Sequence, residues 1–303
     1  MNDLVSVLVL FWPLFAMSMT IFVIIGFVLA IFVGSTLLFT GVVLYGLYSF
    51  LRDEGVFTWL YEKMSMLRIQ LTDHLRENIQ KSFLIKGSVP LSLKTPVLYV
   101  CHPHGLYGFS WYIHFSACLS EWPLLPQKRP KLAVHSSLFR IPFVRELMYF
   151  SNCIQATESE ICETLKGGDS VALVLGGIEE LHKTSGDGIK LIIKKRNGFL
   201  RIAEKAGVPL VPLITVGENE LFPFLKSPML DQLQQALYSW FHIALPVPTW
   251  TSFKEWIKIV DRPLRKPLTT YILEPVTHVT KKNYIKRILD FAKSENVRIE
   301  IIG

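Results

Sequence analysis

The chain has 303 residues, half of them hydrophobic, and a formal net charge of +7 at pH 7, which leaves room for one large domain or two. An excess of basic over acidic residues suits binding to an anionic membrane surface as well as to a nucleic acid. No recognised nucleic-acid motif is present, so we expect no nucleic-acid partner. The four cysteines form neither a C-x-x-C pair nor a regular framework, which indicates free thiols in a reducing compartment.

The N-terminal region is strongly apolar. No Asp, Glu, Lys, Arg or His occurs from Leu4 to Leu51, and one helix of that length would measure roughly 70 Å at about 1.5 Å per residue. Because a bilayer core is only about 30 Å thick, the run predicts two helices folded back on each other, with a turn at residues 34–36; a single span is the alternative. We therefore expect a transmembrane hairpin over residues 1–51. It lacks the positive start of a signal peptide, so we expect it to be retained.

Residues 52–90 predict an amphipathic connecting helix. Among charged residues, apolar side chains recur with a spacing near i+4 at Leu67, Leu71 and Leu75. Just beyond the apolar run come Arg52, Lys63 and Arg68, and a basic flank tends to stay in the cytoplasm. Both ends of the predicted hairpin are therefore expected on that side.

In the rest of the chain, short apolar runs alternate with helix signals. A capping box at Thr157 and the glycine at Gly167 bound one predicted helix, and Asn197 and Gly207 bound another. Parallel strands need crossover connections, so this alternation predicts an α/β domain over residues 91–303, with a largely parallel sheet and flanking helices. The four predicted strands are Val97–Cys101, Leu132–Val134, Val171–Leu175 and Leu210–Val216.

Residues with side chains that can take part in catalysis or binding follow each predicted strand, and ligands bind at this end of the strands in such sheets. Pro103 confines His102 to extended conformations, and side chains two apart on an extended chain share a face, so His102 and His104 are expected to face one cleft. Neutral histidine is the usual general base near pH 7. Cys101 points to the opposite face, which favours core packing over a role as a covalent nucleophile. The four segments are His102–Gly105, His135–Ser137, Gly176–Glu180 and Gly217–Asn219.

The H-x-H spacing also suits two ligands of one metal ion. His135, Glu180 and Glu218 could complete such a set from later strands. A metal-dependent hydrolase is therefore an alternative of another reaction class.

The HPHG sequence at His102–Gly105 resembles the signature of the diacylglycerol acyltransferase type-2 family, which includes monoacylglycerol and wax-alcohol acyltransferases. Further motifs agree in order over roughly residues 95–276, and the ordered set is far more specific than any one of them. The family's N-terminal membrane hairpin also fits the charge-free run. The further motifs are FRIPFVRE at 139–146, GGIEE at 176–180, RNGF at 196–199, VP at 211–212 with GENE at 217–220, KPLTT at 266–270 and EP at 274–275.

The resemblance implies a glycerolipid-acyltransferase-like fold and an acyl-CoA-dependent O-acyltransferase that forms triacylglycerol from diacylglycerol. Monoacylglycerol and fatty alcohol are the alternative acceptors, and a non-catalytic lipid-binding membrane protein is the alternative that is not an enzyme. Acyl-CoA would be a co-substrate, with no cofactor and no metal. The implied setting is the endoplasmic reticulum membrane, with the site on or near its cytoplasmic face, and the lipid-droplet surface. Membrane lipids are expected partners, and a homo-oligomer is left open.

The resemblance also directs the mechanistic expectation. His102 takes the proton of the acceptor hydroxyl, Glu180 of the GGIEE motif orients its imidazole, and His104 assists in the same cleft. The HxxxxD pairing of related acyltransferases is absent, since counting on from His102 reaches Tyr107. Backbone N-H groups near the glycines of the two loops are expected to hold the developing oxyanion. These glycines are Gly105, Gly176 and Gly177.

The basic segment from Lys183 to Arg201 is a candidate surface for the phosphates of CoA; a solvated basic surface is the alternative. Arg196 is favoured within it because it matches the family's motif, and Lys195 is its neighbour. The remaining site candidates lie in other motifs. They are Arg140 for acyl-CoA binding, with Glu218 and Asn219 as further site residues.

Overall fold

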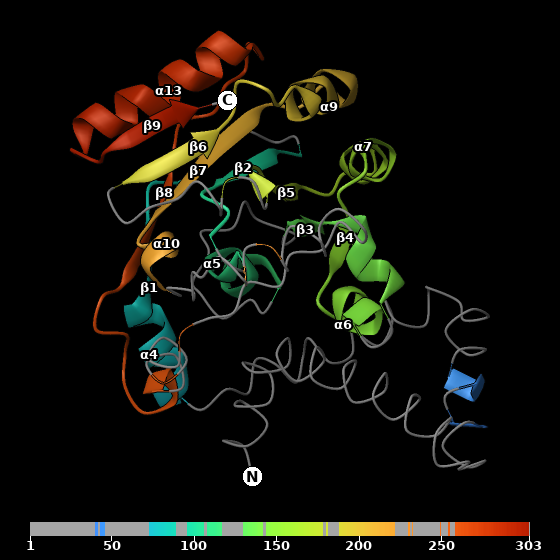
Figure 1. Cartoon of the computed structure of the whole chain (residues 1–303). Coiled ribbons are helices and arrows are strands. Elements are labelled where there is room, and N and C mark those ends of the chain that lie inside the picture. Colours follow the sequence, from blue (N-terminus) through green and yellow to red (C-terminus); the bar gives the residue numbers. More distant parts are fainter. Residues whose placement is uncertain are drawn as a thin grey trace. The chain divides into compact units, whose positions relative to one another are not determined.

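The structure of the chain is a computed structural model (Figure 1). The chain divides into two compact units, one of residues 1–72 and 135–155, the other of residues 73–134 and 156–303. The residues that the structure describes are 40–41, 43–45, 73–88, 96–105, 108–116, 130–141, 144–177, 180, 188–221, 230, 232, 249, 254 and 258–302.

In the first unit, helical residues are described at 40–41 and 43–45, and the hydroxyl of Tyr45 donates to the carboxylate of Glu146 at 2.8 Å. Apart from these few residues, the hairpin predicted for residues 1–51 lies outside the described part of the chain. Among the described residues, no helix is both long enough and apolar enough to cross a bilayer. The unit also holds a 3-10 helix at Ser136–Arg140, α6 at Val144–Phe150 and β4 at Cys153–Gln155.

The second unit is built on a sheet in which the described strands follow the order β1-β8-β7-β2-β5-β3. Strand β2 is parallel to both of its neighbours, β3 is parallel to β5, and β1 is parallel to β8; only the β7-β8 pair is antiparallel. The prediction of an α/β fold with a largely parallel sheet is confirmed. The strands are β1 (Phe83–Lys86), β2 (Leu98–His102), β3 (Lys131–Val134), β5 (Val171–Val174), β7 (Leu210–Val216) and β8 (Leu268–Ile272).

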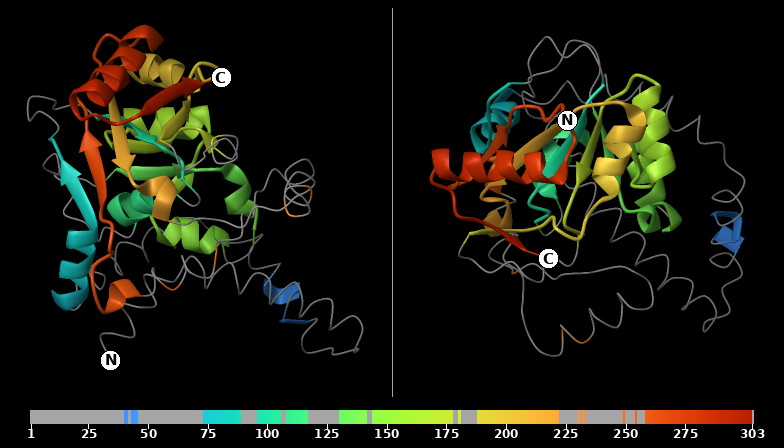
Figure 2. Two further views of the ribbon diagram at one scale, coloured as in Figure 1. Left: turned by 60° about the vertical axis from the view of Figure 1, so that its left-hand side comes forward. Right: turned by 90° about the horizontal axis from the view of Figure 1, so that it is seen from above.

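Helices flank this sheet on both sides. Figures 1 and 2 show α13, α9 and α7 in a row along one side and α5 on the other. A second, two-stranded parallel sheet pairs β6 with β9. The elements are α4 (Asp73–Ser82), α5 (Phe109–Trp111) continuing as a π-helical turn (Tyr112–Ser116), α7 (Glu158–Lys166), β6 (Ile189–Ile192), α9 (Gly198–Ala206), α10 (Glu218–Leu221), a 3-10 turn (Lys258–Val260), α13 (Lys281–Ser294) and β9 (Ile299–Ile302).

The helix boundaries follow from local chemistry. The hydroxyl of Thr157 accepts the N-H of Glu160 at 3.4 Å, as the capping box predicts. Gly207 ends α9 in the left-handed conformation, with φ at 67°, which glycine adopts without steric cost. Asn197 does precede α9, but its side chain makes no capping hydrogen bond.

The connecting helix predicted for residues 52–90 is described only from Asp73. From there α4 runs to Ser82, and residues 83–86 form strand β1 beside β8. The helix therefore ends where a partner strand becomes available to the backbone of Phe83. The paired residues are 185 positions apart in the chain, a separation that no local sequence pattern covers.

Strand β2 lies at the centre of the sheet and is buried along its whole length. Successive side chains point to opposite faces of a strand. On one face Tyr99 packs against Phe115 with the ring centroids 6.0 Å apart, and on the other His102 packs against Tyr284 of α13 at 6.1 Å. The strand thus ties the two helical layers together, and its last residue is His102.

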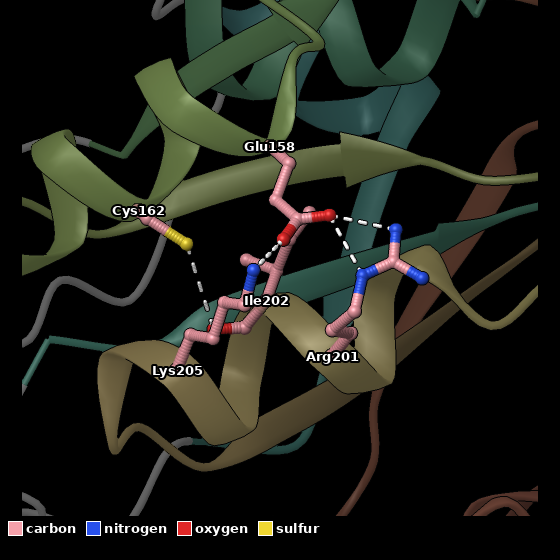
Figure 3. A network of polar contacts seen from close by, with 5 residues as sticks. All are labelled: Glu158, Cys162, Arg201, Ile202 and Lys205. Atoms are coloured by element: carbon pink, nitrogen blue, oxygen red, sulfur yellow. Dashed lines mark hydrogen bonds and ion pairs between the residues drawn. The ribbon is translucent and has the colours of Figure 1, made fainter.

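A polar network joins α7 to α9 on the surface of the second unit (Figure 3). The carboxylate of Glu158 accepts from Nε of Arg201 at 2.7 Å and also pairs with Lys205. The hydrogen bond from Arg201, followed by that from Lys205, lowers the pKa of Glu158 to about 2. Nearby, Sγ of Cys162 lies 3.9 Å from the carbonyl oxygen of Ile202, so this cysteine faces the joint between the two helices.

Candidate active site

Three loops meet at the carboxyl ends of the parallel strands β2, β5 and β7. His102 ends β2, Gly176 and Gly177 follow β5, and Glu218 follows β7. Because β2 pairs with both β5 and β7, its loop lies between the other two. The sheet therefore gathers the HPHG, GGIEE and GENE segments at one edge, where ligands bind in sheets of this kind.

His102 belongs to the protein core. Its side chain has no exposed area, and Nε2 lies 2.8 Å from the hydroxyl of Tyr284. Nδ1 is buried without a hydrogen-bond partner. Burial lowers the pKa of His102 to about 3, which keeps the ring neutral at physiological pH. The family resemblance predicts His102 as the general base; in this structure its ring is fully buried.

His104 has the opposite environment. It is partly exposed, and Nδ1 lies 2.9 Å from the carbonyl oxygen of Gly105. A carbonyl only accepts hydrogen bonds, so Nδ1 carries the proton and Nε2 carries the lone pair. Burial lowers the pKa of His104, although the Gly105 carbonyl opposes this, and Nε2 has no partner among the described residues. His104 is therefore a neutral imidazole with an available basic nitrogen.

The two imidazoles do not face one cleft as the strand spacing predicted. The β-strand ends at His102. The alternation of side chains that applies within a strand therefore does not extend to His104. His102 contacts Tyr284 of α13, and His104 contacts the loop itself.

Glu180 holds the main chain of this loop. It is 1% exposed, and its Oε1 accepts the backbone N-H of His104 at 2.8 Å, while Oε2 accepts the N-H of Ile192 in β6 at 3.0 Å. Burial raises the pKa of Glu180 to about 7, against the two backbone N-H groups and Arg196, which lower it. The family resemblance predicts that Glu180 orients the His102 ring. The structure instead places it on the backbone of His104.

The glycines of the GGIEE segment make room for this carboxylate. A Cβ at Gly176 would lie 2.3 Å from Oε2 of Glu180, and its φ of +110° is a conformation that other residues rarely adopt. Nη2 of Arg196 donates to the carbonyl oxygen of Gly176 at 3.3 Å. Gly177, with φ at +63°, continues the turn. Thus Gly176 is required for packing against Glu180, whatever its backbone N-H binds.

Glu218 holds the other end of the HPHG loop. Its side chain is 2% exposed; Oε1 accepts the N-H of Phe109 at 2.7 Å, and Oε2 accepts the N-H of Ser110 at 3.2 Å and the Ser110 hydroxyl. Burial raises the pKa of Glu218 to about 7. A Cβ at Gly105 would lie 2.6 Å from Cγ of Glu218. Gly105 therefore lets the loop pass close to this carboxylate.

The remaining candidates are two residues of the second unit and two of the first. Lys195 is exposed beside Arg196, and Nδ2 of Asn219 is buried without a hydrogen-bond partner in the described residues. Arg140 is exposed in the first unit, as is His135, whose Nδ1 accepts the N-H of Ser137. Within the described ranges, no group of three or more His, Cys, Asp or Glu residues is arranged to hold a metal ion.

Several supporting residues were missed from the sequence. Nε1 of Trp111 donates to the carbonyl oxygen of Pro103 at 3.0 Å, and Nε2 of His114 lies 2.9 Å from Oγ1 of Thr270, which lies 2.7 Å from that of Thr215. The position of Thr270 in KPLTT was the one available signal. For Tyr284, which is 182 positions from His102, there was none.

The family described as diacylglycerol acyltransferase matches residues 84–291, which is more than half of the chain. This match contains the HPHG loop and both buried carboxylates. The chain belongs to the diacylglycerol acyltransferase family.

The curated relatives are named after different acyl acceptors. The chain is 31% identical over 186 residues to acyl-CoA wax alcohol acyltransferase 2 from Homo sapiens, covering 58% of this chain and 55% of that one. It is 31% identical over 183 residues to 2-acylglycerol O-acyltransferase 1 from Bos taurus (58% and 54%), and 34% identical over 131 residues to diacylglycerol O-acyltransferase 2A from Umbelopsis ramanniana (42% and 37%). The chain spans about half the length of the curated relatives it matches.

Proposed function

We propose that this protein is an acyl-CoA-dependent O-acyltransferase that forms triacylglycerol from diacylglycerol. The observation that carries the proposal is His104: a partly exposed, neutral imidazole whose Nε2 has no partner among the described residues, in a loop held by Glu180 and Glu218. Membership in the diacylglycerol acyltransferase family supports the reaction type.

In the proposed reaction, Nε2 of His104 takes the proton of the acceptor hydroxyl as the hydroxyl oxygen attacks the thioester carbonyl. The tetrahedral intermediate collapses, the carbon-sulfur bond breaks, and the CoA thiolate takes the proton back from the imidazolium. The products are an ester and CoA. A lowered pKa suits this cycle, because His104 is neutral at the start and its conjugate acid gives up the proton readily.

The proposal moves the general base from His102 to His104 and gives His102 a supporting role. The oxyanion would be held by main-chain N-H groups, for which Gly105, Gly176 and Gly177 are the candidates, since their loops meet beside His104.

Acyl-CoA would approach along the loop between β6 and α9. Arg196 is exposed there and yet reaches the carbonyl of Gly176, so this cation lies beside the GGIEE turn. Lys195 is exposed next to it and would add a second contact to the CoA phosphates. Arg140 is kept as a further candidate for acyl-CoA binding on the grounds of its motif.

Diacylglycerol is the proposed acceptor, with monoacylglycerol and long-chain alcohol as the alternatives that the relatives' names suggest. Because such acceptors stay in lipid while acyl-CoA arrives from water, we place the site at the cytoplasmic face of the endoplasmic reticulum membrane, held there by the predicted hairpin. Membrane lipids would then be partners, and lipid droplets a second location.

The deciding experiment supplies labelled acyl-CoA and each of the three acceptors in turn to membranes that contain the protein. Products are separated by lipid class. His104→Ala should abolish ester formation, while the exposed His278→Ala variant serves as the control. Labelled fatty acid without any ester would indicate a hydrolase, and the absence of any product would indicate a non-catalytic protein; either would overturn the proposal.

A further inference from the structure

The helix that follows the HPHG loop begins without a cap of its own. Its N-cap residue is Gly108, in the left-handed conformation with φ at 60° and with no side chain to accept a hydrogen bond. The first N-H groups of a helix lack partners within the helix. Here the N-H groups of Phe109 and Ser110 are accepted by Glu218, which lies 109 and 108 positions further along the chain. A residue that follows strand β7, far along the chain, therefore supplies the cap.

Burying the Glu218 carboxylate is energetically unfavourable, so a purely structural role does not readily account for it. A buried carboxylate is usually paired with a cation, because its desolvation is strongly unfavourable. Among the described residues no Lys or Arg pairs with Glu218, and its three hydrogen bonds all go to Phe109 and Ser110. Glu180 differs, since Arg196 favours its charged form. All three hydrogen bonds of Glu218 are made to residues that directly follow the loop of His104.

The backbone N-H groups of His104 and Phe109 are thus each held by a buried carboxylate. Glu180 accepts the N-H of His104, and Glu218 accepts the N-H of Phe109, five positions later. Between them Gly105 passes against the Glu218 side chain, where a Cβ would lie 2.6 Å from Cγ. Displacement of either anchor would move the imidazole relative to the substrates.

We propose that Glu218 is a positioning residue for acyl transfer: by holding Phe109 and Ser110, it fixes the loop that aims Nε2 of His104. This inference rests on the proposed function. It concerns only how the base is held.

Two variants separate the contacts that Glu218 makes. Glu218→Gln keeps the size of the side chain but replaces one acceptor oxygen by an amide nitrogen, which cannot accept the N-H of Ser110. Ser110→Ala removes only the hydroxyl contact. Glu220→Gln is the matched control: it makes the same change two positions away on α10, at an exposed side chain paired with Lys266.

The test compares kcat and KM for acyl-CoA in the wild-type protein and these variants, together with the rate at which diethyl pyrocarbonate modifies His104, followed by peptide mass spectrometry. Glu218→Gln should lower kcat by about tenfold to a hundredfold, the loss expected when a reacting group is misplaced by about 1 Å, with KM changed less than about twofold. The His104 modification rate should change as well. Ser110→Ala should show a smaller loss, and the double variant should lose no more than Glu218→Gln alone.

A Glu218→Gln variant with wild-type kcat and an unchanged His104 modification rate would overturn the inference while leaving the proposed function intact. Equal loss in Glu220→Gln would also overturn it, because the effect would not be specific to the anchor. If the wild-type protein forms no ester, the proposed function itself fails, and the modification rates still report whether Glu218 holds the loop.

Discussion

The carboxylate of Glu180 accepts the backbone N-H of His104 at 2.8 Å, so this histidine is held by its main chain while its ring stays available. The same carboxylate reaches Ile192 in β6 at 3.0 Å. One buried side chain thus connects the HPHG loop to a separate sheet.

Glu180 should make stability depend on pH. Its folded-state pKa is raised from 4.5 to about 7, so between these values the folded state binds more protons than the unfolded state. The free energy of unfolding should therefore fall as pH rises from 4.5 to 7, by on the order of 3 kcal/mol from this residue, and stay level above 7. Chemical denaturation across this pH range should show a shallower fall in Glu180→Gln; identical slopes would refute the prediction. Glu218 keeps its own contribution in both proteins.

Gly176→Ala should inactivate the protein through Glu180. The added Cβ would lie 2.3 Å from Oε2, which forces the carboxylate away from His104. We expect kcat to fall by about a hundredfold. Gly168→Ala is the control, since Gly168 also has a positive φ, at +93°, but has no atom within 4 Å of the added Cβ. Acyl-transfer assays that show equal losses in the two variants would attribute the effect to backbone strain alone.

Tyr284→Phe should cost stability more than catalysis. The change leaves Nε2 of His102 buried without a partner, which costs about 1–3 kcal/mol. Because His102 is not the proposed base, kcat should change less than about threefold, a factor worth under 1 kcal/mol. Thermal unfolding and acyl transfer would be measured on the same preparations, with the exposed pair of Tyr271 and Lys86 providing the control variant Tyr271→Phe. A large loss of kcat at unchanged stability would indicate that His102 takes part in the reaction.

Arg196→Glu should raise KM for acyl-CoA by about tenfold or more, the effect of losing one charge-assisted hydrogen bond. The rise should shrink at high salt, since exposed charges are screened. Lys293→Glu makes the same charge change at an exposed site on α13. If KM does not change, or changes equally in both variants, the basic segment is a solvated surface and not a CoA site.

The sequence predicted much of the central sheet because its strands are short apolar runs with clear boundaries. Strand β7 has the predicted limits, and β2 differs by one residue at each end. Strands β1 and β8 were missed: each is short and polar in part, β1 pairs with β8 across 185 positions, and β8 also pairs with β7. Local patterns do not contain such pairings.

The sequence predicts which segments gather at the edge of the sheet, but not the contacts that their side chains make. The HPHG, GGIEE and GENE segments each follow a predicted strand, and the rule for parallel strands places such segments at one edge of the sheet. The choice between His102 and His104 depends on where β2 ends and on Tyr284, which lies on a helix far along the chain. Likewise, the Glu218 contact to Phe109 and Ser110 has no counterpart in residue spacing.

The pairing of β9 with β6 links the final described strand to the chemistry. Ile299–Ile302 pairs in register with Ile189–Ile192, and the N-H of Ile192 holds Glu180, which holds His104. Strand β6 also leads directly into the loop of Lys195 and Arg196. A truncation or bulky tag at this strand would therefore register as a catalytic and coenzyme-affinity defect, in a part of the chain that carries no reactive group.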